Sequence, residues 1–239
     1  MDACKYYYGI ISQYAAQYLP PPTTKSKTYN IKKFYHKHLQ DGFRTDAVSG
    51  WLLYASYYYV TGQYSVTLRL TEYVLSRCKH DMVHVDRDNR KEENINNYRR
   101  KVHSKTSLND RIKLATVDLV TYMWHSSLIP GELQLEVENQ PFCIPPTVLS
   151  YCLRFLFHHH LGNMLNRQQA LHNLHLIVRD DYSISLDDLS ESETILGVCH
   201  EISGNKISAC QFYDKAMHNN VKVCRSSKAR KSTPCVAET

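Results

Sequence analysis

The chain has 239 residues, of which 43% are hydrophobic, enough for a sizeable core in one larger domain or two small ones. The formal net charge is only +6, an excess that does not by itself indicate nucleic-acid binding. With 8 Gly, 8 Pro and little strand-like alternation, the composition argues against an all-β protein built on tight turns and favours helices.

The cysteines indicate a reduced cellular compartment. All 8 are scattered, without a Cys-x-x-Cys pair, and there is no Asn-x-Ser/Thr sequon. The first residues make a poor signal peptide, because Asp2 lies near the start and Gln13 interrupts the apolar stretch. We therefore expect a cytoplasmic protein.

Residues 1–45 are predicted to form an N-terminal helix and a linker. The first twenty residues have a helical composition, and the run Pro20–Pro22 ends that helix because proline cannot continue it. The polar residues 23–30 then indicate a linker, followed by a short helix over 31–39.

Residues 46–218 are predicted to form one helical-repeat domain. Its first part includes the uncharged segment 47–68, which is long enough to cross a bilayer. However, the segment is rich in tyrosine and Gly62 interrupts its middle, so we expect a buried helix pair and no membrane partner.

Two regions interrupt the helical pattern of this domain. Residues 79–107 are strongly polar and predict a mobile loop or a solvated helix. A helix is then expected over 108–124, with Ser107 or Asn109 as its cap. Over 132–144, apolar residues first alternate with polar ones and a turn follows, which predicts a small β-hairpin.

Two more helix pairs are expected, over about 146–178 and 190–218, before a basic tail over 219–239 that we expect to be disordered. Small and bulky residues recur at matching intervals in the first and last pairs, as close packing of two helices requires. The middle pair needs about three additional residues in its turn, so we expect it to be degenerate. The positions that define the repeat are Trp51, Ala55, Tyr58, Gly62, Gly162, Ala170, Leu196, Gly197, His200, Gly204, Ala209, Tyr213 and Ala216.

These intervals resemble the tetratricopeptide repeat. The resemblance implies an all-α fold of stacked antiparallel helix pairs, here with one small β-hairpin insertion. Such repeats share a continuous core and present a concave surface formed by the first helix of each pair. Repeat positions place four candidate partner-binding residues on that surface: Ser56, Tyr59, His159 and Glu201.

Three segments also resemble the C-terminal extension of invertebrate proteins in the cyclic GMP-AMP synthase-like (male-abnormal twenty-one) family. They are DAVSGWLLYASYYYVTGQY, SSLIPGELQLEVENQPFCIPPTV and LGVCHEISGNKISACQFYDKAM, and the similarity covers roughly residues 30–218. In that family the helical region follows a nucleotidyltransferase core. Here no glycine precedes a serine, and the acidic pair Asp86 and Asp88 lies in a polar loop, so no catalytic residue is carried over.

Histidine and cysteine clusters do not form a convincing catalytic or metal site. His158, His159 and His160 are consecutive, and successive helical side chains diverge by about 100°, so they cannot converge on one ion. Cys199 and His200 diverge for the same reason, without an orienting acid. We therefore expect no enzyme activity and no cofactor.

The sequence thus favours a non-enzymatic scaffold that binds a protein or peptide partner on its concave face. Two alternatives remain open. The chain could be a fragment of a nucleotidyltransferase of the family above, with a role in innate sensing. It could also bind nucleic acid weakly through residues 87–113 and the tail, with an affinity that falls steeply with salt.

Overall fold

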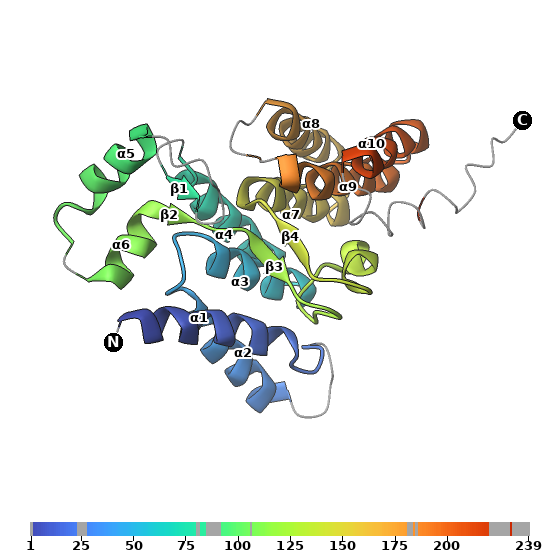
Figure 1. The fold of residues 1–239 in the computed structure, drawn as a ribbon. Coiled ribbons are helices and arrows are strands. Elements are labelled where there is room, and N and C mark those ends of the chain that lie inside the picture. Colours follow the sequence, from blue (N-terminus) through green and yellow to red (C-terminus); the bar gives the residue numbers. More distant parts are fainter. Residues whose placement is uncertain are drawn as a thin grey trace, which may run out of the picture.

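The computed structural model of the protein describes residues 2–22, 28–79, 82–84, 92–105, 107–180, 184, 186–219 and 230. Helices dominate this part of the chain, which confirms the all-α prediction (Figure 1). In chain order the elements are α1 (Asp2–Gln17), α2 (Thr28–Gly42), α3 (Ser49–Val60), α4 (Tyr64–Arg77), β1 (Val83–His84), α5 (Glu92–Val102), α6 (Leu108–Ala115), β2 (Thr116–Val117), β3 (Val120–Tyr122), the 3₁₀ helix η1 (Gly131–Val137), β4 (Phe142–Ile144), α7 (Pro146–His160), α8 (Met164–Asp180), α9 (Leu186–Ile202) and α10 (Lys206–Asn219).

Three helix pairs, α3/α4, α7/α8 and α9/α10, are joined by the same turn. Gly62, Gly162 and Gly204 have φ of 76°, 66° and 84°, a left-handed conformation that only glycine adopts without a steric cost. In each turn the glycine N–H donates to the carbonyl three residues earlier, and the next N–H donates to the carbonyl five residues earlier. This is the Schellman arrangement, which satisfies the free carbonyls at a helix end.

The middle pair differs from our expectation. Its turn contains no additional residues, because Gly162 occupies the same place as the other two turn glycines and α8 follows at once. The position held by Thr67 and Ala209 in the other pairs is occupied by Arg167, and Ala170 lies one helical turn later, where it is buried. The pair is therefore irregular in its side chains and regular in its backbone.

Close contact between paired helices explains why small residues occur at certain positions of the predicted repeat. The Thr67 hydroxyl donates to the carbonyl of Ala55 across the first pair, at 3.1 Å, and both residues are fully buried. In the last pair, a Cβ atom at Gly197 would overlap the aromatic ring of Tyr213. These positions accept only small side chains because another residue already fills the space beside them.

The predicted hairpin over 132–144 is wrong in its first strand. Leu133 and Val137 are fully buried while Leu135 is exposed, so the spacing of the buried residues is helical and the segment forms η1. The partner of β4 is instead β3, which pairs with it in antiparallel register from Val120 opposite Ile144.

The strand β3 lies within the predicted helix over 108–124. Ser107 does cap this helix, its hydroxyl accepting the N–H of Asp110 at 3.1 Å, but α6 ends at Ala115. Val117, Val120 and Tyr122 are buried beyond that point. Their β-branched and aromatic side chains pack well in extended backbone, which explains why the helix does not continue.

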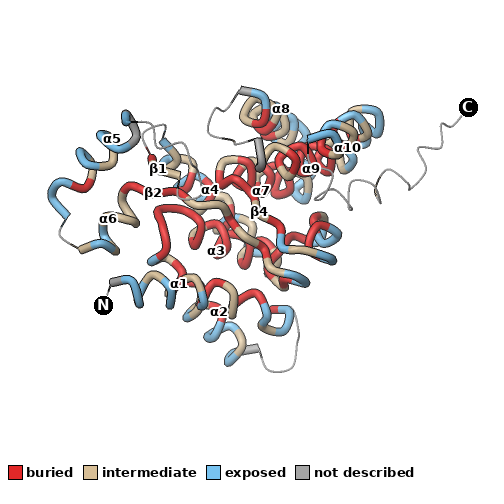
Figure 2. The backbone as a smooth tube through the Cα atoms, in the orientation of Figure 1, coloured by how far each residue is buried: buried red, intermediate tan, exposed pale blue. Residues whose placement is uncertain are grey.

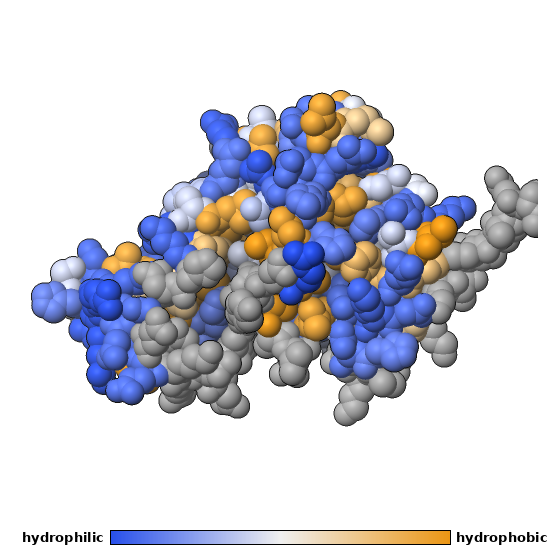
Figure 3. Space-filling view, turned by 90° about the horizontal axis from the view of Figure 1, so that it is seen from above, coloured by the Kyte–Doolittle hydropathy of each residue, from blue (hydrophilic) through white to orange (hydrophobic). Residues whose placement is uncertain are grey.

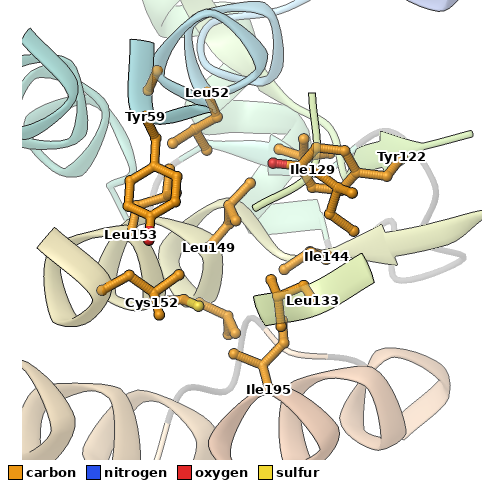
Figure 4. Close-up of a cluster of buried hydrophobic side chains, with 14 of the residues drawn as sticks. Leu52, Tyr59, Tyr122, Ile129, Leu133, Ile144, Leu149, Cys152, Leu153 and Ile195 are labelled. Carbon is orange, nitrogen blue, oxygen red and sulfur yellow. The ribbon is translucent and has the colours of Figure 1, made fainter. Parts of the chain in front are cut away.

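The insertion from β3 to β4 fills the space between the helix pairs. Figure 4 shows Leu133 of η1 and Ile144 of β4 among Leu52 of α3, Leu149 of α7 and Ile195 of α9. Buried backbone is concentrated in α3, α7 and α9, the first helices of the three pairs (Figure 2). Residues of β3, η1 and β4 thus complete the hydrophobic core between the three helix pairs.

Two further parts complete the described fold. From α1 and α2, Ala16, Tyr35 and Leu39 join the same hydrophobic cluster, so the core continues across the predicted boundary at residue 45. Within the polar region 79–107, the described residues include the solvated helix α5 and the strand β1, which pairs in parallel with β2. The predicted disorder of the tail concerns residues that, apart from Arg230, lie outside the described part of the chain.

Candidate functional site

Ser56, predicted to line the concave surface, is fully buried. Its hydroxyl donates to the carbonyl of Leu52 at 2.9 Å and lies 2.5 Å from the hydroxyl of Tyr122. The prediction of a surface role is therefore wrong for this residue, because β3 covers it.

Tyr59 is covered in the same way by η1. Its hydroxyl donates to Glu132 Oε1 at 2.8 Å, and His160 Nε2 lies 2.8 Å from the Tyr59 hydroxyl and 2.9 Å from the same carboxylate oxygen. Burial, followed by the charge of Glu132, raises the pKa of Tyr59, so the hydroxyl stays protonated and remains a donor. Tyr59 is 4% exposed, and its predicted contact with a partner is wrong.

The His159 ring forms a hydrogen bond with α8, the second helix of its own pair. Its Nδ1 lies 3.2 Å from Nη1 of Arg167. Burial, followed by the charges of Arg167 and His160, lowers the pKa of His159 and favours the neutral ring. The structure therefore does not bring His159 together with Ser56 and Tyr59 in one hydrogen-bonded site.

Glu201 keeps an accessible carboxylate at the end of α9, with 44% of its side chain exposed. Its Oε2 accepts a hydrogen bond of 2.5 Å from the hydroxyl of Tyr213 and lies 3.3 Å from Nη1 of Arg230. Glu201 is thus in contact with Arg230, the described residue of the C-terminal tail.

Arg230 makes three directional contacts, each through a different nitrogen. Its Nε donates to Glu136 Oε1 at 3.1 Å, its Nη1 to Glu201 at 3.3 Å, and its Nη2 to the main-chain carbonyl of Glu132 at 2.9 Å. We call the receiving group, made of Glu136, Glu201, Tyr213 and the Glu132 carbonyl, the arginine socket.

The arginine socket is largely shielded from water. The side chain of Arg230 is 10% exposed and that of Glu136 is 1% exposed. Burial alone would lower the pKa of Arg230, but the negative charges of Glu136 and Glu201 outweigh it, so the pKa is raised. Burial and the bond to Glu201 also raise the pKa of Tyr213, which therefore remains a hydroxyl donor. The socket thus holds a fully charged guanidinium.

The local folding of two elements positions the socket. One turn of η1 separates Glu132 from Glu136, so the same short helix bonds Tyr59 through one side chain and Arg230 through the other. In the last pair, the missing Cβ of Gly197 makes room for the ring of Tyr213, whose hydroxyl then reaches Glu201. The contact between Gly197 and Tyr213, two positions of the predicted repeat, thus supports the acidic side of the socket.

The histidines and acidic side chains of the described residues do not gather into a metal site. Among the described residues no group of three or more His, Cys, Asp or Glu side chains could hold a metal ion. Both ring nitrogens of His200 are buried without a hydrogen-bond partner in this part of the chain, and its ring stacks on Phe212 at 5.2 Å. His200 therefore packs against Phe212 with both ring nitrogens shielded from solvent.

Sequence reasoning missed Glu136 and Arg230. The signal for Glu136 was the i, i+4 spacing of Leu133 and Val137, which indicates a helical turn with Glu132 and Glu136 on its other sides. Arg230 carried no signal beyond the basic composition of the tail, because only the folded structure places it beside two acidic side chains.

No family model, curated protein or solved structure matches this chain. The resemblances to the tetratricopeptide repeat and to the cyclic GMP-AMP synthase-like family therefore stay predictions. In the described residues, no helix combines the length and the apolar character that crossing a membrane requires.

Proposed function

We propose that the protein is a non-enzymatic interaction module that binds a peptide segment of a partner protein between η1 and the last helix pair. The observation that supports this proposal is the position of Arg230, a residue far along the chain that is held there by three polar contacts. An edge that accommodates a tail residue has the shape and hydrogen-bonding groups to accommodate a similar residue of another chain.

The protein surface is mixed in character, and the carboxylates of the arginine socket favour polar recognition of a partner. On the face seen in Figure 3, hydrophobic side chains are interspersed among hydrophilic ones. Carboxylates at the edge steer a basic segment towards it and select against acidic ones. We propose that this interaction takes place in the cytoplasm, a reducing compartment that suits the free cysteines of the described residues.

An array of short synthetic peptides tests this function. The purified chain is expected to bind a subset of basic peptides, and Glu201→Lys is expected to abolish that binding by reversing the charge beside Tyr213. Glu138→Lys makes the same charge change at an exposed position just after η1 and serves as the control. An array in which both variants bind the same peptides as the wild type would contradict the proposal.

A second candidate function is nucleic-acid binding, which one observation favours. The last turn of α5 carries Arg99, Arg100 and Lys101, and the first two are exposed. Phosphate contacts by such residues would make affinity fall steeply with salt. Filter binding of a single-stranded oligonucleotide at two salt concentrations, compared with an Arg99→Glu, Arg100→Glu variant, separates this function from peptide binding.

A further inference from the structure

We propose that the arginine socket is a binding site for the arginine side chain of a basic peptide, and that Arg230 is its intramolecular occupant. The inference rests on the proposed function, for which it names the ligand and a competitor within the same chain. A partner peptide would then bind by displacing Arg230 from Glu136, Glu201 and the Glu132 carbonyl.

The directions of the contacts select arginine over lysine. Three nitrogens of one planar group donate to three acceptors, which come from two elements, η1 and α9. A guanidinium carries five N–H donors in a fixed plane, whereas a lysine ammonium is a single nitrogen. One nitrogen cannot occupy the positions of Nε, Nη1 and Nη2 together, so a lysine would leave at least one acceptor unbonded.

The burial of Glu136 favours an occupied socket. With Arg230 in place, 1% of the Glu136 side chain is exposed to solvent. Removing the guanidinium takes a charged partner away from a carboxylate that is buried in the occupied socket, which is unfavourable. An emptied socket therefore has a strong tendency to accept another guanidinium, whereas the exposed rim at Glu201 is open to approach from solvent.

The covalent connection makes Arg230 an effective competitor. Arg230 belongs to the segment that follows α10 in the chain, so its binding to the socket is intramolecular and does not depend on protein concentration. A free peptide must compete with this internal ligand, and its apparent affinity is lowered by the fraction of sockets already occupied. Substituting Arg230 should therefore increase the affinity for an added arginine peptide.

The test uses a fluorescein-labelled peptide that copies residues 226–232, SSKARKS, and measures its binding by fluorescence polarisation. The full-length Arg230→Ala variant is expected to bind this peptide at least about tenfold more tightly than the wild type. A peptide with lysine in place of the arginine should bind the variant at least about tenfold more weakly, and one with alanine should not bind measurably.

Two variants in the Arg230→Ala background locate the binding. Glu136→Gln should abolish binding of the SSKARKS peptide, whereas Glu138→Gln, at an exposed position of the same segment, should leave it unchanged. Circular dichroism confirms that both variants retain their helices. Equal binding of the arginine and lysine peptides, or binding insensitive to Glu136→Gln, would overturn the assignment of the socket.

The remaining outcomes separate this inference from the proposed function. If the wild type and Arg230→Ala bind the peptide equally and Glu136→Gln abolishes binding, the site stands and the intramolecular competition is overturned. If neither protein binds the SSKARKS peptide, the arginine site is overturned. The peptide array with Glu201→Lys then still decides whether another peptide binds at this edge.

Discussion

The first and last helix pairs share a turn and differ in what covers the inner face of their first helix. In α3 the inner residues Ser56 and Tyr59 bond to Tyr122 of β3 and Glu132 of η1, and both are buried. At the end of α9, Glu201 remains partly exposed and meets Arg230 instead. The insertion buries both of these α3 residues, whereas the carboxylate at the end of α9 stays partly exposed beside the charged side chain of Arg230.

This difference shows that a repeated backbone does not determine a repeated surface. The three Schellman turns are alike in φ and in hydrogen bonding. What a partner can reach depends on the segments inserted between the pairs, and here the insertion contributes Leu133 and Val137 to the hydrophobic cluster. Loss of the apolar contacts of η1 should mainly lower the free energy of unfolding. Loss of the polar contacts at the end of α9 should mainly weaken peptide binding, and the following variants distinguish the two.

The largest expected effect comes from shortening a buried apolar side chain of η1. Leu133→Ala should lower the free energy of unfolding by about 2–5 kcal/mol, because Leu133 is fully buried among the three pairs. Leu135→Ala, in the same 3₁₀ helix but 40% exposed, should change it by less than about 0.5 kcal/mol. Urea denaturation followed by circular dichroism measures both. Equal losses would show that η1 does not close the core.

A smaller effect is expected from adding a side-chain atom where α9 and α10 are in close contact. Gly197→Ala places a Cβ against the ring of Tyr213, and overpacking of this kind costs about 1–3 kcal/mol. Displacement of the ring should also weaken the bond from its hydroxyl to Glu201 and reduce peptide binding in the Arg230→Ala background. Thermal unfolding and fluorescence polarisation report the two consequences separately.

Gly131→Ala is the matched control, because a Cβ at Gly131 meets no described atom within 4 Å. This variant should unfold and bind like its parent. If Gly197→Ala does so too, the contact between Gly197 and Tyr213 does not position the socket.

The sequence predicted those features that depend on local backbone chemistry. Gly62 and Gly204, two positions of the predicted repeat, form turns with a positive φ, and Ser107 was identified as a possible cap from its residue type alone. In the structure the carbonyls of Tyr58, His158 and His200 accept the equivalent N–H in the three turns. Such features involve neighbours close in sequence.

Features that depend on distant contacts could not be predicted. The alternation of Leu133, Leu135 and Val137 fits a strand as well as a short helix, and only the packing of the first and third against the core favours the helix. Ser56 looked accessible because nothing in its neighbourhood reveals that Tyr122 covers it, at a separation of 66 residues. The bond between Glu136 and Arg230 could not be predicted for the same reason, because 94 residues separate them.

The shared turn itself predicts three similar effects. Alanine at Gly62, Gly162 or Gly204 must adopt a positive φ, which costs about 1 kcal/mol for a residue with a Cβ. At none of the three positions does a described atom lie within 4 Å of the added Cβ, so the cost is conformational and should be alike. Urea denaturation of the three single variants measures it. A much smaller loss for Gly162→Ala would show that the middle pair has a different turn after all.

The smallest effect concerns the interior of the last pair and depends on pH. Burial, followed by the charge of His175, lowers the pKa of His200 below its usual 6.5. As pH falls below about 6.5, the unfolded chain takes up a proton at this ring more readily than the folded chain, so the stability of the protein decreases. His36, His158 and His159 also have lowered pKa values through burial and contribute to the same decrease.

His200→Phe, which keeps a ring against Phe212 and cannot be protonated, should therefore show a shallower loss of unfolding free energy between pH 7 and pH 5. Urea denaturation at each pH measures the slope, and an unchanged slope would mean that His200 is protonated equally well in the folded and unfolded chain.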